Sequence, residues 1–400
     1  MVYWSRIIEY PKNIQLELTI MKLKPKITIA DHFSDLEDPR IERTKHHQLI
    51  DIITLSICAV ICGADTWVDI ESYGRAKYEW LKTILELPNG IPSHDTIARV
   101  FSRLKPEQFQ KCFLSWIQSI SCFNPGEVIA IDGKTLRHSY DRGGDKKAIH
   151  MVSAWATSQR LVLGQVKVDK KSNEITAIPA LLKVLELNGS IVSIDAMGCQ
   201  RSIVKSIVEQ GGDYVITLKK NQPSLYARVE ELFKQAIIQG FSEFTHTAHS
   251  TKKENNHGRS EIRHYLMLSD IKELIDPDNQ WEKLHSIGLI ESVRIVKGKT
   301  TIETRYYISS LPNNAQKFGE SVRSHWGIEN SLHWVLDVGF REDDCRIRKD
   351  NAPQNFAMIR HISLNLLNQE KTSKTGARNK RLRAGWDDDY LTKILAVAVT

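Results

Sequence analysis

The stretch VIAIDGKTLR, residues 128–137, marks the point where the chain changes from helical to strand-like periodicity. Four apolar residues lead into a single acid, Asp132, which is typical of a buried β-strand that ends in a charged residue. A charge at the end of an apolar strand is costly unless it is paired or binds a metal ion. The alternative is an ordinary turn at the end of a strand, because Asp-Gly is a frequent hairpin signal.

The segments that follow predict an α/β fold. Three β-rich runs at tight spacing suit an antiparallel meander, and the strands and helices that alternate after them indicate parallel pairing through crossovers. This is the element order of a ribonuclease H-like catalytic core, a mixed sheet flanked by helices, with Asp132 on its first strand and Asp195 at the C-terminal end of its fourth. The expected strands are 128–134, 150–158, 161–169, 191–195 and 213–219, and the expected helices between them are 173–187 and 200–211.

Two further acids have settings that suit a shared site. Asp195 follows the apolar run IVSI. Open α/β sheets place ligands at the ends of such strands, although Asp is also a favoured helix N-cap. Glu329 lies in RSHWGIENSLHW (323–334), on a predicted helix from residue 315 to Gly339. On this helix four polar residues recur every four positions and therefore share one face, namely His325, Glu329, His333 and Asp337.

These assignments have alternatives. A buried polar cluster with all its hydrogen bonds satisfied is the structural alternative for Glu329. Four other acids compete for a place in the site, namely Glu174, Glu342, Asp343 and Asp344.

Helical periodicity before residue 123 predicts an all-α N-terminal domain that precedes the core. Within it, Ser93 is the expected N-cap of a helix that follows a short turn, which is the outline of a helix-turn-helix. His94, Thr96 and Arg99 would then face a DNA groove, although many helical pairs share this outline without touching DNA. The expected division is an uncertain extension over 1–30 with Met21 as an alternative start, a helical DNA-binding or associated domain over 31–123, the catalytic core over 127–222 and 313–370, a β-rich insertion over 223–312, and a basic C-terminal tail over 371–400.

Composition indicates an ordinary globular protein of the cytoplasm. The 400 residues carry a formal charge of +7, which permits nucleic acid as a partner without demanding it. Six cysteines without CxxC spacing argue against zinc knuckles and disulfides. The longest apolar run, from Leu49, contains Asp51 and is shorter than the ~20 residues of a membrane span, and no secretory signal is evident at the start. We therefore expect no membrane partner.

Basic and aromatic residues lie close to the three acids in sequence. Such cations would neutralise DNA phosphates, and an exposed Trp326 would stack an unpaired base, although a helical Trp is more often part of the core. The residues expected to contact DNA in this way are Lys134, Arg137, Lys219, Lys220, Arg323 and Trp326.

At these motifs the chain resembles the DDE transposases of bacterial insertion sequences, in the branch that includes the H-repeat proteins associated with Rhs elements. The resemblance runs from about Asp31 to Leu367 and rests on DHFSDLEDPR, IAIDGKTLR, KSNEITAIPALL, DAMGCQ, YVITLKKNQ and RSHWGIENSLHWVLDVGFREDDCRIR. It implies Asp132, Asp195 and Glu329 as the catalytic, metal-binding triad, with two Mg²⁺ (or Mn²⁺) ions. It also implies cleavage at transposon ends followed by strand transfer into target DNA.

The implied partner is double-stranded DNA, both the terminal inverted repeats and the target, bound by a homodimer assembled on the ends in the nucleoid. One departure concerns the helix of the third acid. In related transposases this helix carries an Arg and a Lys that grip the DNA end, at positions held here by His325 and Leu336. Arg323, His325 and His333 are the expected substitutes. A catalytically silent or domesticated DNA-binding protein and a stand-alone nuclease of the same fold remain alternatives.

Overall fold

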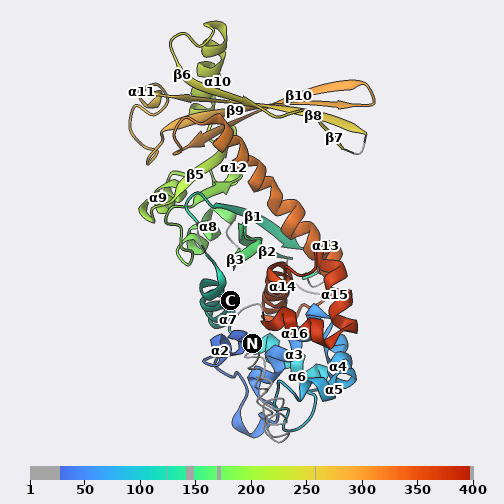
Figure 1. Ribbon diagram of the computed structural model, residues 1–400. Coiled ribbons are helices and arrows are strands. Elements are labelled where there is room, and N and C mark those ends of the chain that lie inside the picture. Colours follow the sequence, from blue (N-terminus) through green and yellow to red (C-terminus); the bar gives the residue numbers. More distant parts are fainter. Residues whose placement is uncertain (1–27, 123, 141–147, 169–172, 257, 397–400) are drawn as a thin grey trace, which may run out of the picture.

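A computed structural model describes residues 28–122, 124–140, 148–168, 173–256 and 258–396. The expected N-terminal extension over 1–30 lies outside the described residues except for 28–30. Figure 1 shows the N-terminal helices at one end of the molecule, a sheet in the middle, and long strands at the other end.

The N-terminal region is helical, as predicted. The run from Leu49 forms α3, which is buried along almost its whole length and is therefore a core helix. Ser93 caps α6 as expected, because its hydroxyl accepts a hydrogen bond from the Thr96 amide at 3.4 Å. The elements are α2 (Thr28–Phe33), η1 (Glu42–Thr44), α3 (Leu49–Ile61), α4 (Trp67–Ala76), α5 (Tyr78–Leu81), α6 (His94–Arg103) and α7 (Pro106–Ile120).

The central strands confirm the ribonuclease H-like core. β1, β2 and β3 form an antiparallel meander, and β4 and β5 add to the other edge of β1 in parallel, so that the strand order is β3-β2-β1-β4-β5. The strands are β1 (Val128–Leu136), β2 (Ile149–Ala156), β3 (Leu161–Lys167), β4 (Ile191–Ile194) and β5 (Asp213–Leu218), and the elements between them are α8 (Glu174–Leu182), η2 (Ala196–Gly198) and α9 (Arg201–Glu209).

The insertion is rich in β-structure, as expected, but it does not form a sheet of its own. β10 pairs antiparallel with β5, from Tyr306 opposite Leu218 to Ser309 opposite Val215, so that core and insertion share one ten-stranded sheet. The elements are α10 (Pro223–Ile238), β6 (Thr245–Ser250), β7 (Glu254–Asn256), β8 (Arg259–Ser269), α11 (Lys272–Ile275), β9 (Ser286–Val296) and β10 (Lys299–Ser309).

After the insertion, one long helical rod crosses the core sheet. α12 begins beside the insertion strands and runs obliquely over the sheet towards α13, as Figure 1 shows. Between them, residues Glu329–His333 form a π-helical turn. The elements of this last part are α12 (Ala315–Ile328), the π turn η3 (Glu329–His333), α13 (Trp334–Phe340), η4 (Glu342–Asp344), α14 (Ala352–Gln369), α15 (Ala377–Trp386) and α16 (Asp388–Ala396).

The described part of the segment 371–400, which was expected to be a basic tail, forms α15 and α16. Lys380 and Arg381 are buried there. The Lys380 amine donates to the Leu367 carbonyl at 2.8 Å, and the Arg381 guanidinium donates to the Val60 carbonyl at 2.8 Å. These cations therefore satisfy main-chain carbonyls near helix ends, an arrangement that composition alone does not reveal. Among the described residues, no helix is long and apolar enough to cross a membrane.

Candidate active site

Asp132 and Asp195 occupy equivalent places on adjacent parallel strands. The register pairs Ile131 of β1 with Ile194 of β4, and each acid is the next residue along its strand. The side chain of Asp132 accepts a hydrogen bond from the Gly133 amide at 2.8 Å, and that of Asp195 accepts one from the Met197 amide at 3.0 Å. The sheet therefore holds two oriented carboxylates at one level. Asp195 directly follows β4, as predicted, whereas Asp132 does not end its strand, because β1 continues to Leu136 and Asp132 pairs with Ser153 of β2.

Glu329 approaches these two carboxylates from the helix that covers the sheet. It is the first residue of the π turn and is exposed. Within the described residues its carboxylate has no hydrogen-bond or ion-pair partner, while its charge contributes to raising the pKa of Asp132. Single π turns occur often at functional sites.

Burial and neighbouring carboxylates raise the pKa of Asp132 and of Asp195. Burial is the main cause of the raised pKa of Asp132, about 7, and the charges of Asp195, Glu174 and Glu329 raise it further. Burial also raises the pKa of Asp195, followed by the charge of Glu174. The region around Asp132 and Asp195 is therefore partly desolvated and negatively charged, and a bound cation would stabilise these charges.

The donor atoms suit a hard divalent cation, although the carboxylates are not gathered around one point. Among the described residues, no three His, Cys, Asp or Glu side chains are close enough together to hold a metal ion. Carboxylate oxygens are nonetheless the ligands that Mg²⁺ and Mn²⁺ prefer. Neither Asp132 nor Asp195 has an ion pair with Lys or Arg in the described part of the chain, so the chemistry of the site fits such an ion.

Three of the four helix residues predicted to share a face do point towards the sheet. Nδ1–H of His325 donates to the Ser193 carbonyl of β4 at 3.1 Å. Nδ1 of His333 lies 3.6 Å from Oδ2 of Asp132, and Asp337 forms an ion pair with Lys134 of β1. Burial lowers the pKa of both histidines to about 4, so both rings are neutral at physiological pH.

Lys134 belongs to a buried ion-pair cluster. Its amine pairs with Asp337 and, at 2.6 Å, with Glu342, and its side chain is only 12% exposed. Glu342 also lies 3.8 Å from Arg360, and the side chains of both are 2% exposed. Lys134, His325 and His333 are all turned into the protein, where they hold the helical rod to β1 and β4. DNA contact by these three residues stays a prediction.

The remaining residues predicted to bind DNA lie at or near the surface. Lys219 and Lys220 follow β5 and are exposed, and the charge of Lys219 lowers the pKa of Asp195. Arg137 is exposed and pairs with Asp343 at 3.2 Å. In the predicted helix-turn-helix, Nδ1 of His94 lies 2.6 Å from Oε2 of Glu71. The Thr96 hydroxyl lies 3.2 Å from that of Ser93, and Arg99 is exposed. DNA contact by these residues stays a prediction.

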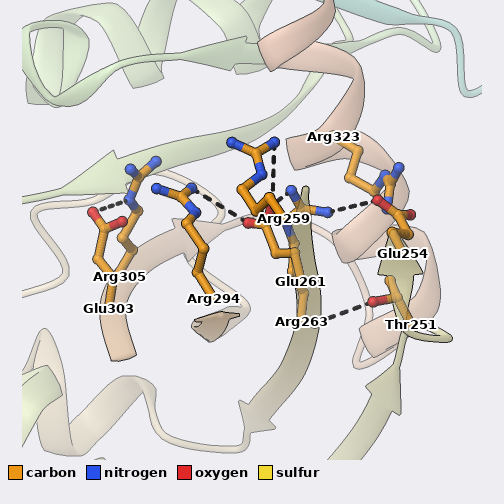
Figure 2. A network of polar contacts seen from close by, with 9 residues as sticks. All are labelled: Thr251, Glu254, Arg259, Glu261, Arg263, Arg294, Glu303, Arg305 and Arg323. Atoms are coloured by element: carbon orange, nitrogen blue, oxygen red, sulfur yellow. Dashed lines mark hydrogen bonds and ion pairs between the residues drawn. The ribbon is translucent and has the colours of Figure 1, made fainter. Parts of the chain in front are cut away.

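The sequence reasoning missed four arginines on the insertion, which together with Arg323 of α12 form a row, the arginine row, shown in Figure 2. Glu261 of β8 is shared by Arg263 at 2.9 Å and Arg294 at 3.4 Å. The alternation of basic and acidic residues over 259–263 is the sequence pattern that could have predicted this row, because alternate residues share one face of a strand. The row consists of Arg259, Arg263, Arg294, Arg305 and Arg323, interleaved with Glu254, Glu261 and Glu303.

Trp326 connects the arginine row to the helix that carries Glu329. The guanidinium carbons of Arg263 and Arg305 each lie 5.2 Å from the centre of its ring. Such cation–π contacts keep the arginines beside α12. The Trp326 ring contacts these two cations in the DNA-free protein, and stacking on an unpaired base stays a prediction.

The sheet order, the acids on two adjacent parallel strands and the acid on the covering helix define a ribonuclease H-like protein with a carboxylate site. The chain belongs to the DDE transposases: the model of the transposase DDE domain matches residues 124–366, and a DDE_Tnp_1-associated model matches residues 30–117.

Relatives in Escherichia coli K12 support this assignment over nearly the whole chain. The “H repeat-associated putative transposase YhhI” is 44% identical over 372 residues, which cover 92% of this chain and 97% of that protein. The “Putative protein YbfL” is also 44% identical, over 374 residues with the same coverage. These relatives confirm the resemblance to the H-repeat branch. A piggyBac transposase synaptic complex aligns with a TM-score of 0.43 at 12% identity over 96% of this chain and 81% of that one, a likeness too weak to support a conclusion.

Proposed function

We propose that the protein cuts DNA at the ends of a transposable element and joins those ends to target DNA. In the first step water attacks the phosphodiester at the element's end and releases a 3′-hydroxyl. In the second step this hydroxyl attacks a target phosphodiester, and the strand leaving that phosphate takes the displaced oxygen. Each step replaces one P–O bond with another, so neither requires a covalent enzyme intermediate.

Asp132, Asp195 and Glu329 are the residues that would hold two Mg²⁺ or Mn²⁺ ions in this site. Divalent ions supply charge neutralisation at the attacking and leaving oxygens of such a displacement. The protein's own residues position these carboxylates, because the backbone amides of Gly133 and Met197 donate hydrogen bonds that orient the two aspartates.

The single observation that carries the proposal is the register between β1 and β4. It puts Asp132 and Asp195 at the same level on neighbouring parallel strands, where open α/β sheets place ligands. Burial and the adjacent carboxylates raise the pKa of Asp132 to about 7. Two surface acids with a structural role alone would not need to be partly buried beside each other, which costs free energy.

Duplex DNA is the partner that the surface favours. Lys219 and Lys220 lie beside Asp195 at the end of β5, and the arginine row continues along the insertion from Trp326, three residues before Glu329. Five arginines against three glutamates leave this row with an excess of positive charge, which suits phosphates. We expect a homodimer when two ends are held together.

Joining of pre-cut ends separates this function from its alternatives. Fragments of the DNA that flanks the gene, ending in a free 3′-hydroxyl, are incubated with a plasmid target and Mg²⁺. We expect the wild-type protein to give joined products and Asp195→Asn to give none. Cutting of the target without joining would indicate a nuclease, and DNA binding without either product would indicate a silent DNA-binding protein.

A further inference from the structure

A pocket of about 510 Å³ lies between the N-terminal helices and the segment that follows α13. The N-terminal parts of α4 and α6 form one part of its lining, and residues within 341–349 form another. These residues differ from the acids of the proposed metal site and from the arginine row, so the pocket is a separate feature. Its volume lies in the range of pockets that bind small molecules.

The apolar part of the lining is held rigidly. Trp67 of α4, Ala98 of α6 and Ile347 contribute to it. The Trp67 ring stacks on Phe101 with the ring centres 5.2 Å apart, and it meets Phe356 edge-on at 4.9 Å. Such aromatic pairs favour one ring orientation. Trp67 is therefore a fixed aromatic side chain in the wall of the pocket.

Hydrogen bonds fix the two parts of the lining relative to each other. The side-chain amide of Asn355 on α14 donates to the carbonyls of Phe101 and Leu104, at the end of α6, at 2.8 and 3.0 Å. Nε of Arg348 donates to the carbonyl of His138 at 2.9 Å, which ties the segment after α13 to the residues that follow β1. The pocket is therefore pre-formed and is joined to the strand that carries the first acid of the proposed site.

Positive charge at the pocket is not fully compensated. Arg346 and Lys349 line it and are exposed, and within the described ranges neither has a carboxylate at ion-pair distance. Two of the three aspartates in the lining are already paired with arginines, Asp65 with Arg381 and Asp344 with Arg341, each at 3.4 Å. The pocket thus combines an apolar aromatic wall with cations that are available to an anionic group.

This combination fits a nucleotide. Proteins that bind single strands use cations to neutralise the phosphates and aromatic side chains on which the bases stack. A duplex is too wide for a pocket of about 510 Å³, so a base enters it only after leaving its base pair. The occupant that fits both the charge and the size is a single unpaired nucleotide.

We propose that this pocket binds one unpaired nucleotide of a DNA strand. The base lies beside Trp67 and Ile347. Its phosphate lies beside Arg346 and Lys349. The inference deepens the proposed function and rests on it for the source of the strand, because cutting at the element's end frees a strand terminus whose nucleotides can leave the duplex.

Alkylation of Cys345 by N-ethylmaleimide, measured on the full-length protein by peptide mass spectrometry, reports whether the pocket is occupied. Cys345 lines the pocket and is partly exposed, and the exposed Cys122 lies outside it as an internal control. A short oligothymidylate at about ten times its Kd should slow the reaction of Cys345 about 10-fold, because few pockets then stay empty. The reaction of Cys122 should not change.

Replacing Arg346 and Lys349 together with Ala should raise the oligothymidylate concentration for half-protection about 10-fold or more, because hydrogen bonds to charged groups are lost. Both side chains are exposed, so the variant should fold, which circular dichroism checks. Lys205→Ala is the matched control, since it removes an exposed cation of α9 outside the pocket. It should leave half-protection at the wild-type concentration.

Other ligands test the class of the occupant. Deoxythymidine monophosphate should protect Cys345 only at higher concentrations than the oligothymidylate, and inorganic phosphate should not protect it. Protection by polyglutamate but not by the oligothymidylate would overturn the proposal in favour of an acidic peptide. Equal protection by a blunt duplex would overturn the requirement for an unpaired base, and tighter protection by the monophosphate would assign the pocket to a free nucleotide instead.

The same measurement separates this inference from the function on which it rests. If the wild-type protein cuts and joins DNA while the oligothymidylate leaves Cys345 unprotected, the role of the pocket is overturned and the proposed function stands. If the oligothymidylate protects Cys345 but the protein does not cut DNA in Mg²⁺, the proposed function fails and the nucleotide pocket stands.

Discussion

At the scale of the residue, the free-energy cost of burying the Asp132 carboxylate is the clearest sign that the site binds a ligand. Its strand position was predictable, because four apolar residues lead into it. Its surroundings were not, since Asp195, Glu174 and Glu329 come from distant segments of the chain. The same holds for Lys134, which sequence reasoning assigned to DNA and which the structure surrounds with Asp337 and Glu342.

Asp132→Asn should stabilise the metal-free protein above pH 7. Its pKa rises from 3.8 to about 7 on folding, mainly through burial. Between these values the folded chain holds more protons than the unfolded chain, so this group makes the fold less stable as pH rises through that window. The gain should be about 1–3 kcal/mol at pH 8 and should shrink towards pH 4.

Thermal melting in EDTA at several pH values measures this difference. Asp278→Asn, a change at an exposed aspartate of the insertion, should show little effect at any pH. An Asp132→Asn protein that melts below the wild type at pH 8 would contradict the prediction.

At the scale of the element, the helical rod over the sheet shows both the success and the limit of sequence patterns. A helix from residue 315 to Gly339 was predicted, with His325, His333 and Asp337 on one face, and the structure turns these three residues towards the sheet. The π turn at Glu329 was not foreseen, because it depends on packing against β1 and β4 rather than on local propensity. Glu329 and Asn330 are exposed there, whereas Ile328 and Leu332 are buried.

Lys134→Met should loosen this rod from β1. The substitution leaves partly buried Asp337 without its cation and leaves buried Glu342 with Arg360, 3.8 Å away, as its remaining cation. Breaking such a buried pair costs about 3–5 kcal/mol. The midpoint of urea unfolding, followed by circular dichroism, should fall accordingly. Lys205→Met, which removes an exposed i,i+4 pair with Glu209, should change it by about 0.5 kcal/mol or less.

A second substitution identifies the cause. Adding Asp337→Asn to Lys134→Met removes the carboxylate that has lost its cation and should restore part of the missing stability. If Lys134→Met unfolds at the wild-type urea concentration, the cluster does not hold the rod.

At the scale of the whole molecule, the insertion is rigidly continuous with the core through the pairing of β10 with β5. Sequence patterns predicted the β-rich segment but could not predict this pairing, because it joins residues about ninety positions apart without a local signal. The consequence is that the arginine row has a fixed position relative to the acids. The helical N-terminal region was predictable because its apolar spacing is local.

Replacing Arg294 and Arg305 with Ala should weaken binding to duplex DNA. Their side chains are 42% and 37% exposed, and each DNA phosphate that the protein no longer neutralises should reduce the steepness of log K against log salt by about 0.9. Fluorescence anisotropy over a salt series measures both quantities. Lys205→Ala serves as the control for removal of a surface cation, and an unchanged slope in the double arginine variant would exclude the row from the DNA interface.

Cleavage of DNA that carries the element's ends tests the central claim most directly. The wild-type protein should cut this DNA at the ends in Mg²⁺ and not in EDTA. Asp132→Asn should bind the ends with nearly wild-type affinity in a gel-shift assay and should not cut them, because the carboxylate is removed while the DNA-binding surface is retained. Cleavage by Asp132→Asn in Mg²⁺ would contradict the account.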